Sequence, residues 1–104
     1  MTARAFITGV SGFTLTANER SFLREAQPWG FILFGRNVRT PGQIKKLTAE
    51  CREAVGTNAP VLIDQEGGRV QRLGHPHWPQ YPSGATYGRI YDRDVAKGLS
   101  LIHI

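Results

Sequence analysis

Three short apolar segments alternate with two helix-like segments along this chain, and this order limits the possible folds more than any other feature of the sequence. The apolar segments begin near residues 5, 31 and 61, so about 26 to 30 residues separate each one from the next. These connections are long enough to hold a helix. Strands joined in this way lie parallel to each other and are linked by right-handed crossovers. The sequence therefore predicts an α/β fold with a βαβαβ order, either in a doubly wound sheet or in an α/β barrel.

Each predicted strand has its own local signal. Residues 5–10 combine apolar side chains with a glycine-containing turn. Residues 31–34 form a continuous apolar run between two glycines, and residues 61–63 form a third apolar segment. The second run is short and apolar throughout, which is typical of a strand buried on both faces, and we expect the third to be a buried strand as well.

Both predicted helices begin with a cap. Thr16 and the glutamate three residues later have the spacing of a capping box, in which two side chains satisfy free backbone N–H groups reciprocally. We expect this helix to end before Pro28, whose ring disfavours helix in the residue that precedes it. Thr40 followed by Pro41 is an N-cap with a first-turn proline, and apolar residues then recur at helical spacing up to Gly56.

The last third of the sequence has a different character. Residues 74–91 are dense in proline and aromatic residues, which predicts a long loop that covers a site or docks on a neighbour. Its aromatic side chains would either stack on a sugar or pack the loop against the body of the protein. Residues 95–104 lack helical periodicity and contain Gly98, which weakens a helix. We expect this tail to be either non-native or a strand on the open sheet.

Composition excludes several classes of protein. A chain of 104 residues has room for one domain, and 40% hydrophobic with 10% aromatic residues is typical of a globular protein. Basic residues exceed acidic ones, 13 to 8, but only Lys45 and Lys46 are adjacent, so we expect solvated charges and no nucleic-acid partner. No apolar run approaches the roughly 20 residues that cross a bilayer, and the amino terminus lacks the apolar core of a signal peptide. We expect a cytoplasmic protein with no membrane partner.

The chemically informative segment directly follows the third predicted strand. From Asp64 to Leu73 it has the sequence DQEGGRVQRL. In both candidate folds the ligand site lies at the carboxyl ends of the parallel strands. We therefore expect the residues just after Phe34 and Ile63 to form the site.

The charged residues of this segment can form ion pairs with one another. An unpaired carboxylate at the end of a buried strand costs several kcal/mol to desolvate, and Arg69 and Arg72 are nearby cations that can pair with Asp64 or Glu66. Two adjacent glycines allow the backbone to adopt positive φ or to approach a ligand closely. A turn held only by ion pairs is the structural alternative, although two acids, two arginines and two glycines exceed what a turn requires.

Other chemistries find little support. The glycines near residue 9 match neither a phosphate-binding loop nor the turn that carries a nucleophilic serine. His75 and His77 have no cysteine or carboxylate nearby in the sequence, so we expect no metal site and no cofactor. Cys51 lies on the apolar stripe of the second helix without an adjacent base, which predicts a buried thiol in a reducing compartment rather than a nucleophile.

Two segments together resemble a known family. Residues 63–73 (IDQEGGRVQRL) and residues 30–37 (GFILFGRN) are similar to the amino-terminal part of bacterial β-N-acetylglucosaminidases, also called β-hexosaminidases, of glycoside hydrolase family 3. The resemblance spans roughly residues 5–94 and keeps the order of strands and helices. It implies that residues 1–104 are an amino-terminal fragment of a (β/α)8 barrel, with residues 95–104 departing from the family pattern.

The resemblance also implies an activity. Family members remove terminal, non-reducing N-acetylglucosamine from cytoplasmic muropeptides during peptidoglycan recycling. Asp64 and Arg72 match the positions that bind the terminal sugar, where the carboxylate accepts hydrogen bonds from the hydroxyls. Glu66 and Arg69, in the same string, are interpreted as a pair that fixes the loop.

The family reaction retains configuration, with an aspartate nucleophile and a histidine that serves as acid and base in place of the usual carboxylic acid. Both residues lie further along the chain in family members, and neither His75 nor His77 matches the histidine. We therefore expect no catalytic residue within these 104 and no hydrolysis by the fragment itself. The alternative from a different class is a small non-catalytic α/β module that binds a sugar or an anion.

Overall fold

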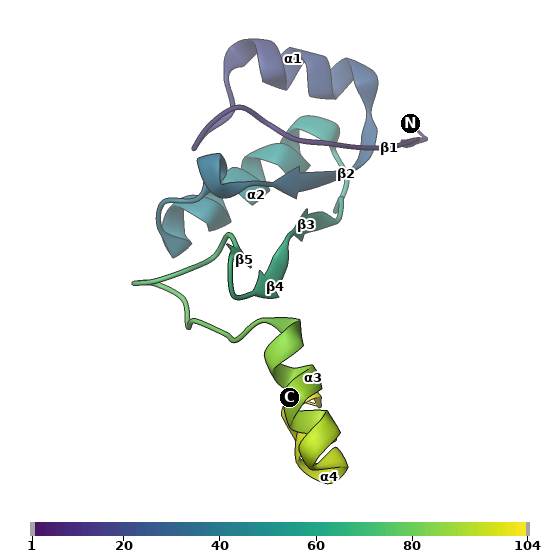
Figure 1. Ribbon diagram of the computed structural model, residues 1–104. Coiled ribbons are helices and arrows are strands. Elements are labelled where there is room, and N and C mark those ends of the chain that lie inside the picture. The colour runs from purple at the N-terminus through teal and green to yellow at the C-terminus, as the bar shows by residue number, and fades with distance from the viewer. Residues whose placement is uncertain (1, 104) are drawn as a thin grey trace. The chain divides into compact units, whose positions relative to one another are not determined.

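The computed structural model describes residues 2–103, and the chain divides into two compact units between Asp64 and Gln65. The first unit contains β1 (Arg4–Thr8), α1 (Ala17–Ala26), β2 (Pro28–Leu33), the short 3₁₀ helix η1 (Gly35–Asn37), α2 (Pro41–Val55) and β3 (Val61–Ile63) (Figure 1). The second unit contains β4 (Gln65–Gly67), β5 (Val70–Gln71), α3 (Gly84–Arg93) and α4 (Val95–Ile102). None of these helices is both long and apolar enough to cross a membrane.

The first unit is built on a three-stranded sheet in the order β1-β2-β3. Both strand pairs are parallel, with Ile7 opposite Gly30 in one pair and Leu33 opposite Ile63 in the other. The prediction of an α/β fold with a parallel sheet and alternating strands and helices is confirmed. The second strand begins at Pro28, two residues before the glycine that marked it in the sequence.

The hydrophobic core lies between the sheet and the two helices, which pack on the same face. Its buried members come from β2, α1, α2 and the connections between these elements: Val10, Leu23, Phe31, Leu33, Leu47, Cys51, Ala54, Val55 and Ala59. In the two outer strands, Ile7 of β1 and Leu62 of β3 are instead exposed, with 44% and 40% of their surface accessible to solvent. The expectation that β3 is a buried strand is therefore wrong, because α1 and α2 cover only one face of the sheet. The central strand β2, which we expected to be buried on both faces, is largely buried, although Trp29 is exposed and Ile32 is half-buried.

The predicted caps of both helices are confirmed. The Thr16 hydroxyl accepts a bond of 3.1 Å from the Glu19 N–H, and the Glu19 carboxylate accepts one of 3.0 Å from the Thr16 N–H. Thr40 caps α2 in the same way, and α2 ends at Gly56, which has a φ of 74°. The first helix ends before Pro28, as expected. These local signals succeed because every partner lies within one turn of the helix end.

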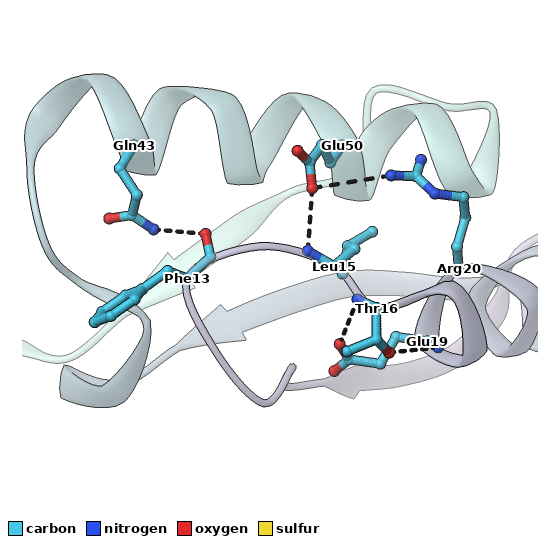
Figure 2. A network of polar contacts seen from close by, with 7 residues as sticks. All are labelled: Phe13, Leu15, Thr16, Glu19, Arg20, Gln43 and Glu50. Carbon is cyan, nitrogen blue, oxygen red and sulfur yellow. Dashed lines mark hydrogen bonds and ion pairs between the residues drawn. The ribbon is translucent and has the colours of Figure 1, made fainter.

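Side chains of α2 also hold the connection between β1 and α1. Figure 2 shows the Gln43 amide donating to the Phe13 carbonyl at 2.8 Å, and the Leu15 N–H donating to the Glu50 carboxylate at 3.0 Å. Arg20 of α1 lies 3.9 Å from the same carboxylate. A connection of eight residues without regular structure is thus fixed by a helix that lies about 30 residues further along the chain.

The second unit begins with a hairpin that the sequence did not predict. Strands β4 and β5 pair antiparallel, with Gln65 opposite Gln71. Gly67 and Gly68 lie at its turn with φ of 82° and 59°, which confirms the predicted positive φ of the glycine pair. Part of the segment DQEGGRVQRL, for which the sequence predicted no strand, therefore makes a short two-stranded sheet.

Two further expectations for this unit are wrong. Residues 84–91 belong to α3 rather than to a long loop, so the connection before α3 covers only residues 72–83. The tail forms α4 and not a strand, and the Asp94 carboxylate caps it by accepting from the Lys97 N–H at 3.1 Å. Gly98, which weakens an isolated helix, is needed here because a Cβ would lie 2.6 Å from the Tyr91 Cα.

Candidate functional site

The carboxyl edge of the parallel sheet brings together the ends of its three strands. Because Leu33 pairs with Ile63, the next residues along the two strands, Phe34 and Asp64, leave the sheet at the same level and on the same edge. Asp64 is half-buried there. This is the edge at which ligands bind in α/β proteins, and it is where the sequence predicted the site.

A buried asparagine fixes the backbone at this edge. Asn37 is fully buried, and its amide donates to the carbonyls of Val10 and Gly12 at 3.0 and 2.8 Å. Its side-chain oxygen accepts from the Phe34 N–H at 2.9 Å. All of the polar atoms of this side chain are therefore satisfied, as burial requires. The bonds tie the segment after β1 to the segment after β2.

Arg36 extends the same edge. Its Nε donates to the Val10 carbonyl at 3.1 Å, and its guanidinium carbon lies 4.8 Å from the centre of the Phe34 ring. Gly9 leaves room for this arginine, because a Cβ there would lie 3.1 Å from an Arg36 Nη atom. The strand ends of the first unit thus carry one exposed cation and one half-buried carboxylate, Asp64.

Three of the predicted site residues lie in the second unit. Arg72 directly follows β5 and is half-buried. Glu66 and Arg69 are exposed, and both line an open pocket of about 440 Å³ together with Ser83 and Gly84. Within the described residues no ion pair joins Glu66 to Arg69. Both side chains are solvated at the hairpin, which lowers the gain from pairing them.

The glycine pair of the hairpin approaches its own chain. A Cβ on Gly67 would overlap the carbonyl oxygen of Pro82, and one on Gly68 would lie 2.9 Å from the Ser83 Cβ. The Gly68 N–H also donates to the Tyr81 carbonyl at 2.8 Å. The sequence suggested that adjacent glycines allow either a positive φ or a close approach to a ligand. Both glycines have a positive φ, and the backbone that they approach closely is that of residues 81–83.

The loop after the hairpin is held by two glutamines that the sequence did not mark as important. The Gln65 amide donates to the Leu73 carbonyl at 2.7 Å and accepts from the Leu73 N–H at 3.0 Å. Gln71 donates to the carbonyls of Leu73 and Pro79 and accepts from the Tyr81 N–H. Both glutamines stand in the string DQEGGRVQRL, but only the hairpin register shows that they lie opposite each other.

Other candidate groups are placed as follows. Cys51 is buried, and burial, followed by the nearby charge of Glu50, raises the pKa of its thiol to about 11, so the prediction of a buried thiol is confirmed. His77 is exposed and contacts Trp78 edge to face, with 5.9 Å between ring centres. Among residues 2–103, no group of three or more histidine, cysteine or acidic side chains is arranged to hold a metal ion.

Comparison with known proteins finds relatives that cover most of this chain. The β-hexosaminidase of Xylella fastidiosa strain 9a5c is 39% identical over 95 residues, which is 91% of this chain and 28% of the relative. The chain therefore spans little more than a quarter of the length of this protein. No model of a protein family matches the chain.

Solved structures agree with this similarity. NagZ from Neisseria gonorrhoeae in complex with a zinc ion has a TM-score of 0.82 and 33% identity over 91% of this chain and 28% of its own. A second NagZ structure, in complex with N-trifluoroacetyl-D-glucosamine, has a TM-score of 0.80 and 32% identity, covering 88% of this chain and 27% of its own. A glycoside hydrolase family 3 β-N-acetylglucosaminidase from Paenibacillus has a TM-score of 0.71 and 30% identity, covering 80% and 16%.

Proposed function

We propose that this chain, which is homologous to part of the bacterial β-hexosaminidases of glycoside hydrolase family 3, supplies the terminal-sugar site of an enzyme that removes terminal, non-reducing β-N-acetylglucosamine. The observation that carries the proposal is the position of Asp64 at the carboxyl edge of the parallel sheet, level with Phe34. The NagZ complex with N-trifluoroacetyl-D-glucosamine supports a ligand of the N-acetylglucosamine type.

In this proposal Asp64 and Arg72 bind the sugar. A carboxylate can accept hydrogen bonds from two sugar hydroxyls at once, and a bond to a charged group is roughly twice as strong as a neutral one. The guanidinium of Arg72 donates to sugar oxygens through its planar set of N–H groups. Glu66 and Arg69 lie beside them in the sequence, as exposed charges at the hairpin.

The remaining parts of the enzyme complete the site. We place the three parallel strands at the start of a (β/α)8 barrel, and we place the nucleophilic aspartate and the acid–base histidine of a retaining reaction outside these residues. The substrate would be a muropeptide or a related glycoside in the cytoplasm, released during peptidoglycan recycling. The exposed face of the sheet, with Ile7 and Leu62, is consistent with further strands that would cover it.

A chimeric enzyme tests the proposal. Residues 2–94 would replace the matching region of the Xylella fastidiosa β-hexosaminidase, and hydrolysis would be measured with the 4-nitrophenyl β-glycosides of N-acetylglucosamine and of glucose. We expect the chimera to prefer the first substrate. An inactive chimera that melts cooperatively would argue against the proposal.

Asp64→Ala in this chimera should lower kcat/KM about 30- to 1000-fold, because about 2 to 4 kcal/mol of charged hydrogen bonding to the sugar is lost. The matched control is Glu53→Ala, which removes an exposed carboxylate from α2 and should leave kcat/KM unchanged. If Asp64→Ala behaved like this control, Asp64 would not bind the sugar.

A further inference from the structure

We propose that Gln71, assisted by Gln65, is a positioning residue that holds Arg72 in the geometry needed for sugar binding. This inference rests on the proposed function, because it concerns the same site. It goes further in giving a role to two uncharged side chains that touch the loop rather than the substrate.

The amide of Gln71 closes the loop that follows the hairpin. Its nitrogen donates to the Leu73 carbonyl at 2.9 Å and to the Pro79 carbonyl at 2.6 Å, while its oxygen accepts from the Tyr81 N–H at 3.0 Å. One side chain thus bonds to the first part of the loop and to its last part. Residues 73–81 are held as a closed loop by these contacts.

Gln65 holds the same backbone from the neighbouring strand. Its amide makes a reciprocal pair of bonds with the N–H and the carbonyl of Leu73, at 3.0 and 2.7 Å. The Leu73 carbonyl therefore accepts from both glutamines. Because Gln71 is paired in β5 and Leu73 is held by two side chains, the backbone is fixed on each side of Arg72.

Fixing this backbone matters because arginine has a long side chain with several rotatable bonds. Ordering such a side chain on binding costs conformational entropy, and a backbone that is fixed on each side of Arg72 limits the positions from which the side chain can reach the sugar, which reduces that cost. Glutamine suits the role because its amide donates and accepts at once. A glutamate of the same length cannot donate to the carbonyls of Leu73 and Pro79.

The test uses the active chimera described above. Gln71→Glu should raise KM for the N-acetylglucosaminide about fivefold to tenfold and leave kcat within about twofold, because uniform binding of the sugar is weakened. Gln80→Glu is the matched control, since it adds the same charge at an exposed position of the same loop and should leave KM unchanged. Gln65→Glu keeps one of its two bonds to Leu73 and should raise KM about threefold.

A double-mutant cycle shows whether Gln71 acts through Arg72. Arg72→Ala should raise KM more than Gln71→Glu does, and adding Gln71→Glu to it should have no further effect. If the increases in KM caused by the two substitutions multiplied in the double variant, the inference would be overturned. So would an unchanged KM in Gln71→Glu with an intact melting transition. If Gln71→Glu fails to fold, the same cycle with Gln65→Glu decides the question.

The cycle also separates the two proposals. An unchanged KM in Arg72→Ala would contradict the proposed role of Arg72 in sugar binding. A raised KM in Arg72→Ala with an unchanged KM in both glutamine variants would contradict only the positioning role.

Discussion

The two compact units of this chain are held together by different kinds of contact. Every buried apolar side chain of residues 2–103 lies in the first unit, between Val10 and Ala59. In the second unit the buried residues of the described chain are two glycines, Gly67 and Gly98, each of which is in close contact with neighbouring backbone. The first unit therefore depends on apolar burial, whereas the second depends on close backbone packing and on hydrogen bonds from glutamine side chains.

The largest effect on stability is expected in the core of the first unit. Leu47 is fully buried between α2 and the sheet, so Leu47→Ala should lower the free energy of unfolding by about 3 kcal/mol through lost burial and a cavity. Urea unfolding followed by circular dichroism measures this loss. The exposed neighbour Lys46→Ala is the control and should change stability little. A loss in Leu47→Ala no larger than in the control would contradict the assigned core.

A smaller and local effect is expected in the second unit. Gly98→Ala would place a Cβ 2.6 Å from the Tyr91 Cα, so α3 and α4 must separate, at a cost of about 1 to 3 kcal/mol. Amide hydrogen exchange should become faster in α4 and stay unchanged in α2. Gly88→Ala is the matched control, because no atom lies within 4 Å of its added Cβ and alanine favours the helix. Faster exchange in both variants would show that close packing is not the cause.

The smallest effect concerns pH and the cap of α1. Burial acts to raise the pKa of Glu19, but hydrogen bonds from the backbone N–H groups of Thr16 and Ser11 outweigh it, so the pKa lies below its usual 4.5. A lowered pKa in the folded state gives stability that is present above the unfolded value and is lost as the pH falls toward the folded one.

Glu19→Gln should therefore lose stability near neutral pH, by about 1 kcal/mol, and show a weaker decline below pH 4.5. Unfolding free energies measured from about pH 7 to about pH 3 test this sign. The exposed Glu25→Gln, on the same helix, serves as the control. Equal acid dependence in Glu19→Gln and in the unaltered chain would contradict the assignment.

The comparison of the two units also explains which parts of the fold the sequence could predict. In the first unit, helix caps at Thr16 and Thr40 and apolar runs at β2 and β3 carry their own signals, and all of these elements were predicted. In the second unit, α4 contains Gly98, which weakens an isolated helix, and only the contact of Gly98 with Tyr91 of α3 shows why a glycine stands there. The pairing of Gln65 with Gln71 depends on a hairpin of strands only two or three residues long, which propensity does not reveal.

The candidate site also has a part that the sequence could predict and a part that it could not. The position of Asp64 was predictable, because any residue that directly follows a parallel strand lies at the carboxyl edge of the sheet. The buried amide of Asn37 was not, since an asparagine after a strand is equally typical of a solvated turn. No ion pair joins Glu66 to Arg69 among residues 2–103, and the side chains of Gln65 and Gln71 hold the loop that follows the hairpin.

The sequence by itself determined the order of strands and helices in the first unit, the beginnings of both its helices and the placement of an acidic residue at a strand end, because each depends on residues close together in the chain. Only the tertiary structure decided which face of the sheet is covered, that the tail is helical and that two glutamines hold the loop after Arg72. These features depend on contacts between elements, and the free energy of such contacts is set by distances in space that local sequence does not specify.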